Sequence, residues 1–107
     1  MKNTFHVTLN DQIIYTYTKK TLPARLRRFL DEIDEKMSFE IRMPESIINN
    51  PNKIQKLQYV AMSLFNAIES NDTNLQEVMS AYLLSNHPAL NEICIIEKNE
   101  IINLELK

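Results

Sequence analysis

The sequence predicts an α+β fold in which an antiparallel sheet of two hairpins packs on three helices, in the order ββαααββ. Both ends of the chain are rich in β-branched and aromatic residues that flank short turns containing Asn. The middle of the chain instead repeats apolar residues at helical spacing. The length of 107 residues, with no linker and no repeat, predicts a single domain over residues 1–107.

The first hairpin is expected over residues 3–18. The segment "TFHVTL" alternates, and "IIYTYT" is rich in residues that favour strands. Asn10 and Asp11 between them tolerate the left-handed backbone that a two-residue turn requires. Regular pairing from this turn would place His6 opposite Tyr15.

The second hairpin is expected over residues 92–106, with its turn at Lys98 and Asn99. That turn would set Glu97 opposite Glu100, which is a mildly unfavourable pair of like charges.

Three helices are expected between the hairpins, over residues 22–37, 51–70 and 73–86, because each segment carries an apolar stripe at helical spacing. Residues with good capping or first-turn chemistry precede each stripe. They are Thr21 and Pro23, then Asn50 and Pro51, then Thr73 with Gln76 or alternatively Asp72.

Residues 38–51 are the least regular part of the chain. Phe39, Ile41 and Met43 alternate, which predicts a short strand, and Pro44 would end it.

The outer face of the sheet is expected to be more apolar than a solvated face, which usually carries Thr, Lys, Glu and Ser. A contiguous apolar patch on a sheet indicates an interaction site. Residues 38–51 could cover it instead, or a register error of one residue would exchange the two faces. The predicted partner-binding residues are His6, Ile13, Tyr15, Tyr17, Ile96 and Ile101.

The sequence offers no arrangement typical of an enzyme, a metal site or a cofactor site. Cys94 lies between two isoleucines with no cation nearby to activate it as a nucleophile. His6 and His87 show no metal-ligand spacing with each other or with Cys94. The chain contains no glycine, which excludes glycine-rich phosphate-binding loops.

The segment "LPARLRRFLDEIDEKM" is basic in its first half and acidic in its second. Helical geometry spreads Arg25, Arg27 and Arg28 around the helix, so they do not form one basic stripe. Arg27 and Arg28 each precede a carboxylate by four residues, which favours pairing along an exposed helix. Arg25 and Arg28, near the helix start, form a weak candidate anion site.

These observations predict a small non-enzymatic binding or regulatory protein that acts as a homodimer through the open sheet face. The net charge of −2 makes nucleic acid an unlikely partner, and no apolar run is long enough to span a membrane. The single cysteine favours the cytoplasm. Two alternatives remain open: a nucleic-acid or anion binder using the three arginines, and a small-molecule module or enzyme with a pocket between sheet and helices.

Overall fold

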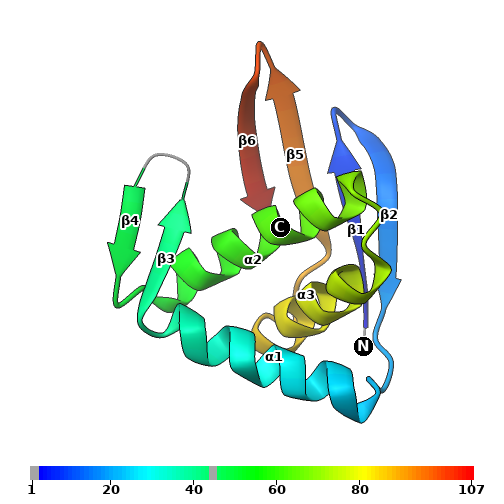
Figure 1. The fold of residues 1–107 in the computed structure, drawn as a ribbon. Helices are drawn as coiled ribbons and strands as arrows, with labels where there is room; N and C mark the ends of the chain where they lie inside the picture. The colour runs from blue at the N-terminus through cyan, green and yellow to red at the C-terminus, as the bar shows by residue number, and fades with distance from the viewer. Residues whose placement is uncertain (1–2, 44–45) are drawn as a thin grey trace.

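The α+β class is confirmed by the structure, a computed structural model that describes residues 3–43 and 46–107 (Figure 1). The described residues form three helices and six strands in the order ββαββααββ, so a strand pair absent from the predicted ββαααββ order lies between the first two helices. The elements are β1 (Thr4–Leu9), β2 (Gln12–Thr18), α1 (Ala24–Met37), β3 (Glu40–Met43), β4 (Ser46–Asn49), α2 (Lys53–Glu69), α3 (Thr73–Asn86), β5 (Glu92–Lys98) and β6 (Ile101–Leu106).

The main sheet has the strand order β2-β1-β5-β6, and it is mixed rather than purely antiparallel. Each hairpin is antiparallel, but β1 and β5 run parallel, with His6 beside Glu92 and Leu9 beside Ile95. The helices between the hairpins carry the chain back to the end of the sheet where β1 begins, as a crossover connection does. The prediction of an antiparallel-only sheet is therefore wrong.

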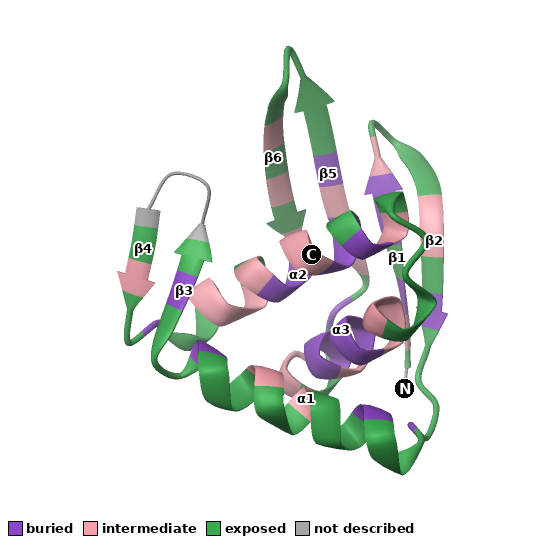
Figure 2. Cartoon of the chain, in the orientation of Figure 1, coloured by how far each residue is buried: buried purple, intermediate pink, exposed green. Residues whose placement is uncertain are grey.

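The helices cover one face of the sheet and leave the other open (Figure 1). The core lies between these two layers, and Figure 2 shows buried residues on α2, α3 and the strands of the sheet. Most of its fully buried side chains come from the two central strands and from α2 and α3, and Ile41 of β3 and Leu90 join them. They include Phe5, Val7, Ile93 and Ile95 from the sheet, and Val60, Leu64 and Leu83 from the helices.

The first hairpin begins as predicted, because Asn10 and Asp11 both adopt positive φ, 49° and 68°, and form its turn. Thr8 then lies opposite Ile13, which is the expected register. One residue later the register shifts, and Ile14 is left as the extra residue of a β-bulge.

The bulge reverses the predicted orientation of the two tyrosines of β2. Val7 lies opposite Tyr15, and Phe5 lies opposite Tyr17. Tyr15 and Tyr17 therefore share the helix-facing side with Phe5 and Val7. Their predicted placement on the open face is wrong, because one inserted residue moves every later side chain to the other face.

The second hairpin turns one residue later than predicted, at Asn99 and Glu100, whose φ angles are 53° and 64°. Glu97 consequently lies opposite Ile102 instead of Glu100, which avoids the like-charge pair. The pairing shifts by two residues, so each residue of β5 and β6 stays on its predicted face of the sheet. Ile95 pairs with Leu104 on the core side, and Ile96 pairs with Asn103 on the open side.

The helices differ from their predicted limits mainly at their first residues. At α1, Pro23 is the N-cap residue, and no side chain caps the helix. At α2 the cap is Asn52 rather than Asn50, and Asn52 and Gln55 form a reciprocal capping box with distances of 2.8 and 2.9 Å. At α3 the bounds match the prediction, and Asp72 supplies the cap.

The predicted short strand near Ile41 is present as β3, and it pairs with β4 in a separate two-stranded sheet. Ile41 is only 1% exposed and joins the main core, and its partner Ile48 packs against the same core. This hairpin packs on α1 and α2. It does not cover the open face of the main sheet, where Ile13 and Ile101 remain exposed.

Candidate interaction surface

The six predicted partner-binding residues fall into two groups. Tyr17 is 3% exposed in the core and Tyr15 is half-buried, so neither contributes to the open face. The other four lie on the open face and are exposed. These four are His6, Ile13, Ile96 and Ile101.

One half of the open face is polar, and its side chains satisfy one another. The Thr4 and Thr18 hydroxyls lie 3.1 Å apart, His6 Nδ1 lies 3.0 Å from the Thr16 hydroxyl, and the Thr8 hydroxyl donates to Glu92 at 2.9 Å. Cross-strand pairs of this kind are typical of a solvated sheet face. His6 therefore belongs to a threonine-rich polar region rather than to an apolar patch.

The other half of the open face is apolar. Ile13, Ile96 and Ile101 are 62%, 38% and 65% exposed, and we call these three residues the isoleucine surface. Ile96 and Ile101 are diagonal neighbours on β5 and β6, because Ile101 pairs with Lys98 and Asn103 pairs with Ile96. Cys94 precedes Ile96 on the same face, and Thr8 lies between Cys94 and Ile13. The surface is thus smaller than the sequence predicts.

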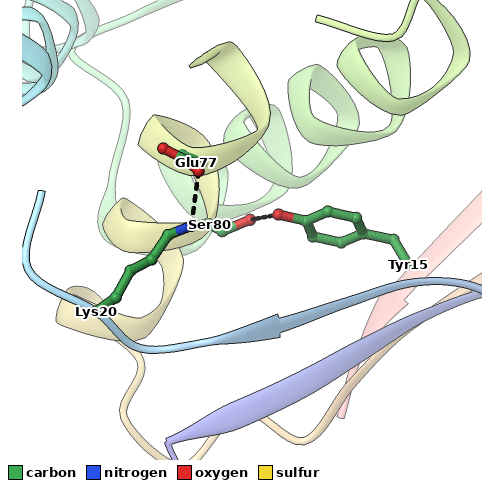
Figure 3. Close-up of polar contacts among 4 residues, drawn as sticks. All are labelled: Tyr15, Lys20, Glu77 and Ser80. Carbon is green, nitrogen blue, oxygen red and sulfur yellow. Dashed lines mark hydrogen bonds and ion pairs between the residues drawn. The ribbon is translucent and has the colours of Figure 1, made fainter. Parts of the chain in front are cut away.

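The tyrosines of β2 instead attach the edge of the sheet to α3. The Tyr15 hydroxyl lies 3.1 Å from the hydroxyl of the fully buried Ser80, and Lys20 pairs with Glu77 at 2.6 Å (Figure 3). Burial raises the pKa of Tyr15, and the hydrogen bond to Ser80 partly offsets this rise. The Tyr15 hydroxyl thus connects the edge strand β2 to α3.

Tyr17 has a different environment. Its ring packs on Phe5 with the ring centroids 5.8 Å apart. Its buried hydroxyl has no hydrogen-bond partner among the described residues. Burial raises the pKa of Tyr17, and the nearby charge of Lys20 partly offsets this rise.

The described surface has three hollows worth noting, and all are open to solvent. One of about 460 Å³ runs along β2 beside Thr73 and Glu77 of α3. A smaller one, of about 220 Å³, is bordered by Tyr17 and Arg27. The third, of about 440 Å³, lies between α2 and β6. None is the enclosed pocket between sheet and helices that a small-molecule module would favour.

The three arginines of α1 remain exposed and separate. Arg27 borders the smallest hollow, whereas Arg25 and Arg28 line none of the three. Within the described part of the chain, neither Arg27 nor Arg28 lies within 4.0 Å of a carboxylate, so the expected pairs along the helix are not formed. The weak anion site at Arg25 and Arg28 stays a prediction.

Over residues 3–43 and 46–107, no group of three or more His, Cys, Asp and Glu side chains is placed to hold a metal ion. None of the helices described is both long and apolar enough to cross a membrane.

Comparison with known proteins yields no assignment. No family model matches the chain, and no curated protein and no solved structure matches it significantly.

One feature near β6 was not anticipated from the sequence. Ile54 belongs to the apolar stripe of α2, yet it is 67% exposed and borders the hollow beside β6. A signal was available in "IINLEL", which contains one charge and no proline although it forms the last strand of the sheet.

Proposed function

We propose that this chain is a small non-catalytic binding protein that forms a homodimer through the open face of its sheet. The isoleucine surface carries the proposal: Ile13, Ile96 and Ile101 are exposed on a sheet face that no described element covers. Exposed apolar side chains gathered on one face of a small domain mark an interaction surface. The lone Cys94 supports a reducing compartment, and we propose the cytoplasm on that basis.

Energetics favour this surface over the polar half of the same face. Full burial of an isoleucine side chain contributes about 1.5–3 kcal/mol. In a two-fold symmetric dimer the same surface is buried on both copies, so each isoleucine position contributes twice. The threonine-rich half already has its polar groups paired, so its burial would add little.

Sedimentation velocity over a wide concentration range tests the proposal. We expect the wild-type chain to dimerise, and the double variant Ile96→Thr/Ile101→Thr to dimerise at least about tenfold more weakly, which corresponds to about 1.4 kcal/mol. Ile47→Thr is the matched control, because Ile47 is also an exposed strand isoleucine, 57% exposed, but lies on β4. A wild-type chain that stays monomeric at every concentration would overturn the proposal, as would a double variant that dimerises like the wild type.

A further inference from the structure

The outer edge of β6 presents unpaired backbone groups. Lys107 N–H donates to Glu92 O at 2.8 Å, and Glu92 N–H donates to Lys107 O at 3.1 Å. Because hydrogen-bonded and non-hydrogen-bonded pairs alternate in an antiparallel ladder, Ile102, Leu104 and Leu106 direct their N–H and C=O groups away from β5. No other strand of the described chain pairs with this edge.

An apolar hollow lies directly beside this edge. Ile54 and Leu57 of α2 and Leu104 and Leu106 of β6 line it, and its volume is about 440 Å³. Residues directly opposite each other on neighbouring strands point to the same face. A strand added to β6 would therefore direct the side chains opposite Leu104 and Leu106 to the side of the hollow.

The edge of β6 lacks the features that usually prevent strand addition. A bulge, a proline or an inward-pointing charge normally protects such an edge. The pairing of β6 with β5 is regular, and β6 contains no proline. Its one charged residue, Glu105, also borders the hollow, but it pairs with Cys94, so strand alternation directs its side chain to the open face.

Two charged residues border the hollow, Lys53 from α2 and Glu105 from β6. Lys53 lines it and forms no ion pair among the described residues. The first turn of α2 contains no acidic residue, so the positive end of the helix adds to the charge of Lys53. His87 also borders the hollow and can donate a hydrogen bond. A carboxylate on the incoming strand would complement Lys53 and the first turn of α2.

We propose that β6 accepts an extended acidic–apolar peptide segment of a partner protein as a fifth strand of the sheet. The backbone edge supplies hydrogen bonds, the hollow takes an apolar side chain, and Lys53 pairs with an Asp or Glu. A second copy fits less well, because the core-facing side chains of its own β6 are Ile102, Leu104 and Leu106, which bring no carboxylate to Lys53. This site does not depend on the isoleucine surface.

Amide NMR of the whole ¹⁵N-labelled chain, titrated with a designed peptide, tests the proposal. The probe alternates Val and Thr and carries a pair of Asp residues at one end, and a second version carries the pair at the other end. One matched peptide replaces Asp by Asn, and another replaces the Thr residues by Pro to remove backbone donors. We expect the shifts to centre on Ile102, Leu104, Leu106 and Ile54, and both matched peptides to bind at least about fivefold more weakly.

Two charge reversals sharpen the test. Lys53→Glu should weaken binding of the Asp peptide by about tenfold or more. Lys56→Glu changes the same charge one turn along α2, at a residue that does not line the hollow, and should change binding by less than about twofold. Running the titration also on Ile96→Thr/Ile101→Thr separates its result from self-association.

Several results would overturn the proposal. They are no shift at about millimolar peptide, shifts centred on the isoleucine surface, equal binding of the Pro peptide, or equal effects of the two charge reversals. Shifts at the β6 amides that grow with protein concentration alone would assign the edge to a second copy instead.

Discussion

The two hairpins of the sheet have the same kind of turn, but their strands differ in regularity. Each turns on a two-residue loop that starts with Asn, continues with Asp or Glu, and has positive φ at both positions. The first hairpin then inserts Ile14 as a bulge, which turns Tyr15 and Tyr17 into the core. The second stays regular and leaves Ile96 and Ile101 exposed on the open face.

The comparison extends to the two edges of the sheet. The edge at β2 is bulged and attached to α3 through Tyr15–Ser80 and Lys20–Glu77 (Figure 3). The edge at β6 is regular and has an apolar hollow beside it. The same sheet thus has one edge that is bulged and attached to a helix, and one edge that is regular and, among the described residues, paired with no further strand.

The largest expected difference in stability between the two hairpins comes from deleting one residue in each of them. Deletion of Ile14 removes the bulge but keeps Tyr15 and Tyr17 facing the core, so we expect a loss of at most about 2 kcal/mol in the free energy of unfolding. Deletion of Ile102 shifts Glu105 to the position opposite Ile95 and should cost more than about 4 kcal/mol, or prevent folding. Urea unfolding measures both, and equal losses would contradict the account.

A smaller effect separates the two tyrosines of β2. Tyr15→Phe leaves the hydroxyl of Ser80 buried and unpaired, so it should lower the free energy of unfolding by about 1–2 kcal/mol. Tyr17→Phe removes a buried hydroxyl that has no partner, so it should leave stability unchanged or raise it by up to about 1 kcal/mol. If thermal or urea unfolding gave the reverse order, the assigned hydrogen bonds would be wrong.

The contacts that α3 makes with α1 and β2 should also weaken at alkaline pH, because Tyr82 of α3 donates to Asp34 of α1 and Tyr15 of β2 contacts Ser80 of α3. Burial, with the nearby charge and hydrogen bond of Asp34, raises the pKa of Tyr82 from 10.0 to about 12, and burial raises the pKa of Tyr15 and Tyr17. The folded state therefore favours the neutral phenols. Their contribution to stability is complete below pH 10 and is lost as the pH rises toward 12.

Unfolding experiments between these two pH values, with a spectrophotometric phenolate titration, measure this loss. Tyr82→Phe should make the decline in stability shallower, because it removes the most strongly shifted phenol. A decline of the same steepness in wild type and variant would contradict the assignment.

The smallest effect on stability is expected at the isoleucine surface. Ile101→Thr should change the free energy of unfolding by less than about 0.5 kcal/mol at concentrations where the chain is monomeric, since Ile101 is 65% exposed. Leu104→Thr, on the other face of the same strand, should cost at least about 1 kcal/mol because Leu104 packs against the core. Similar losses for the two variants would mean that the faces of β6 are assigned incorrectly.

Much of the fold follows from local patterns. Turn chemistry at Asn10–Asp11, the apolar stripe of α3 and the isoleucine-rich run in β5 are signals within a few residues, and each predicts its element correctly. The parallel pairing of β1 with β5 depends on the path of the whole intervening chain, so no local pattern carries it. The bulge at Ile14 could not be predicted from the sequence, because "IIYTYT" alternates equally well in either register.

The candidate site was predictable in part for the same reason. Ile96 and Ile101 lie on the predicted open face because a register shift of two residues leaves each side chain on the same face of the sheet. Tyr15 and Tyr17 do not lie there, because a register shift of one residue moves each side chain to the opposite face. The hollow beside β6 joins Ile54 to Leu104 across fifty positions of sequence, and only tertiary packing brings these residues together.

The reactivity of Cys94 tests most directly whether the open face is a self-association surface. Cys94 is the single cysteine of the chain, is partly exposed, and precedes Ile96 by two residues on the open face, so the unmodified protein carries its own probe. We predict that the rate of Cys94 alkylation falls as protein concentration rises, and that Ile96→Thr/Ile101→Thr abolishes this fall. A wild-type rate that is the same at all concentrations would contradict the account.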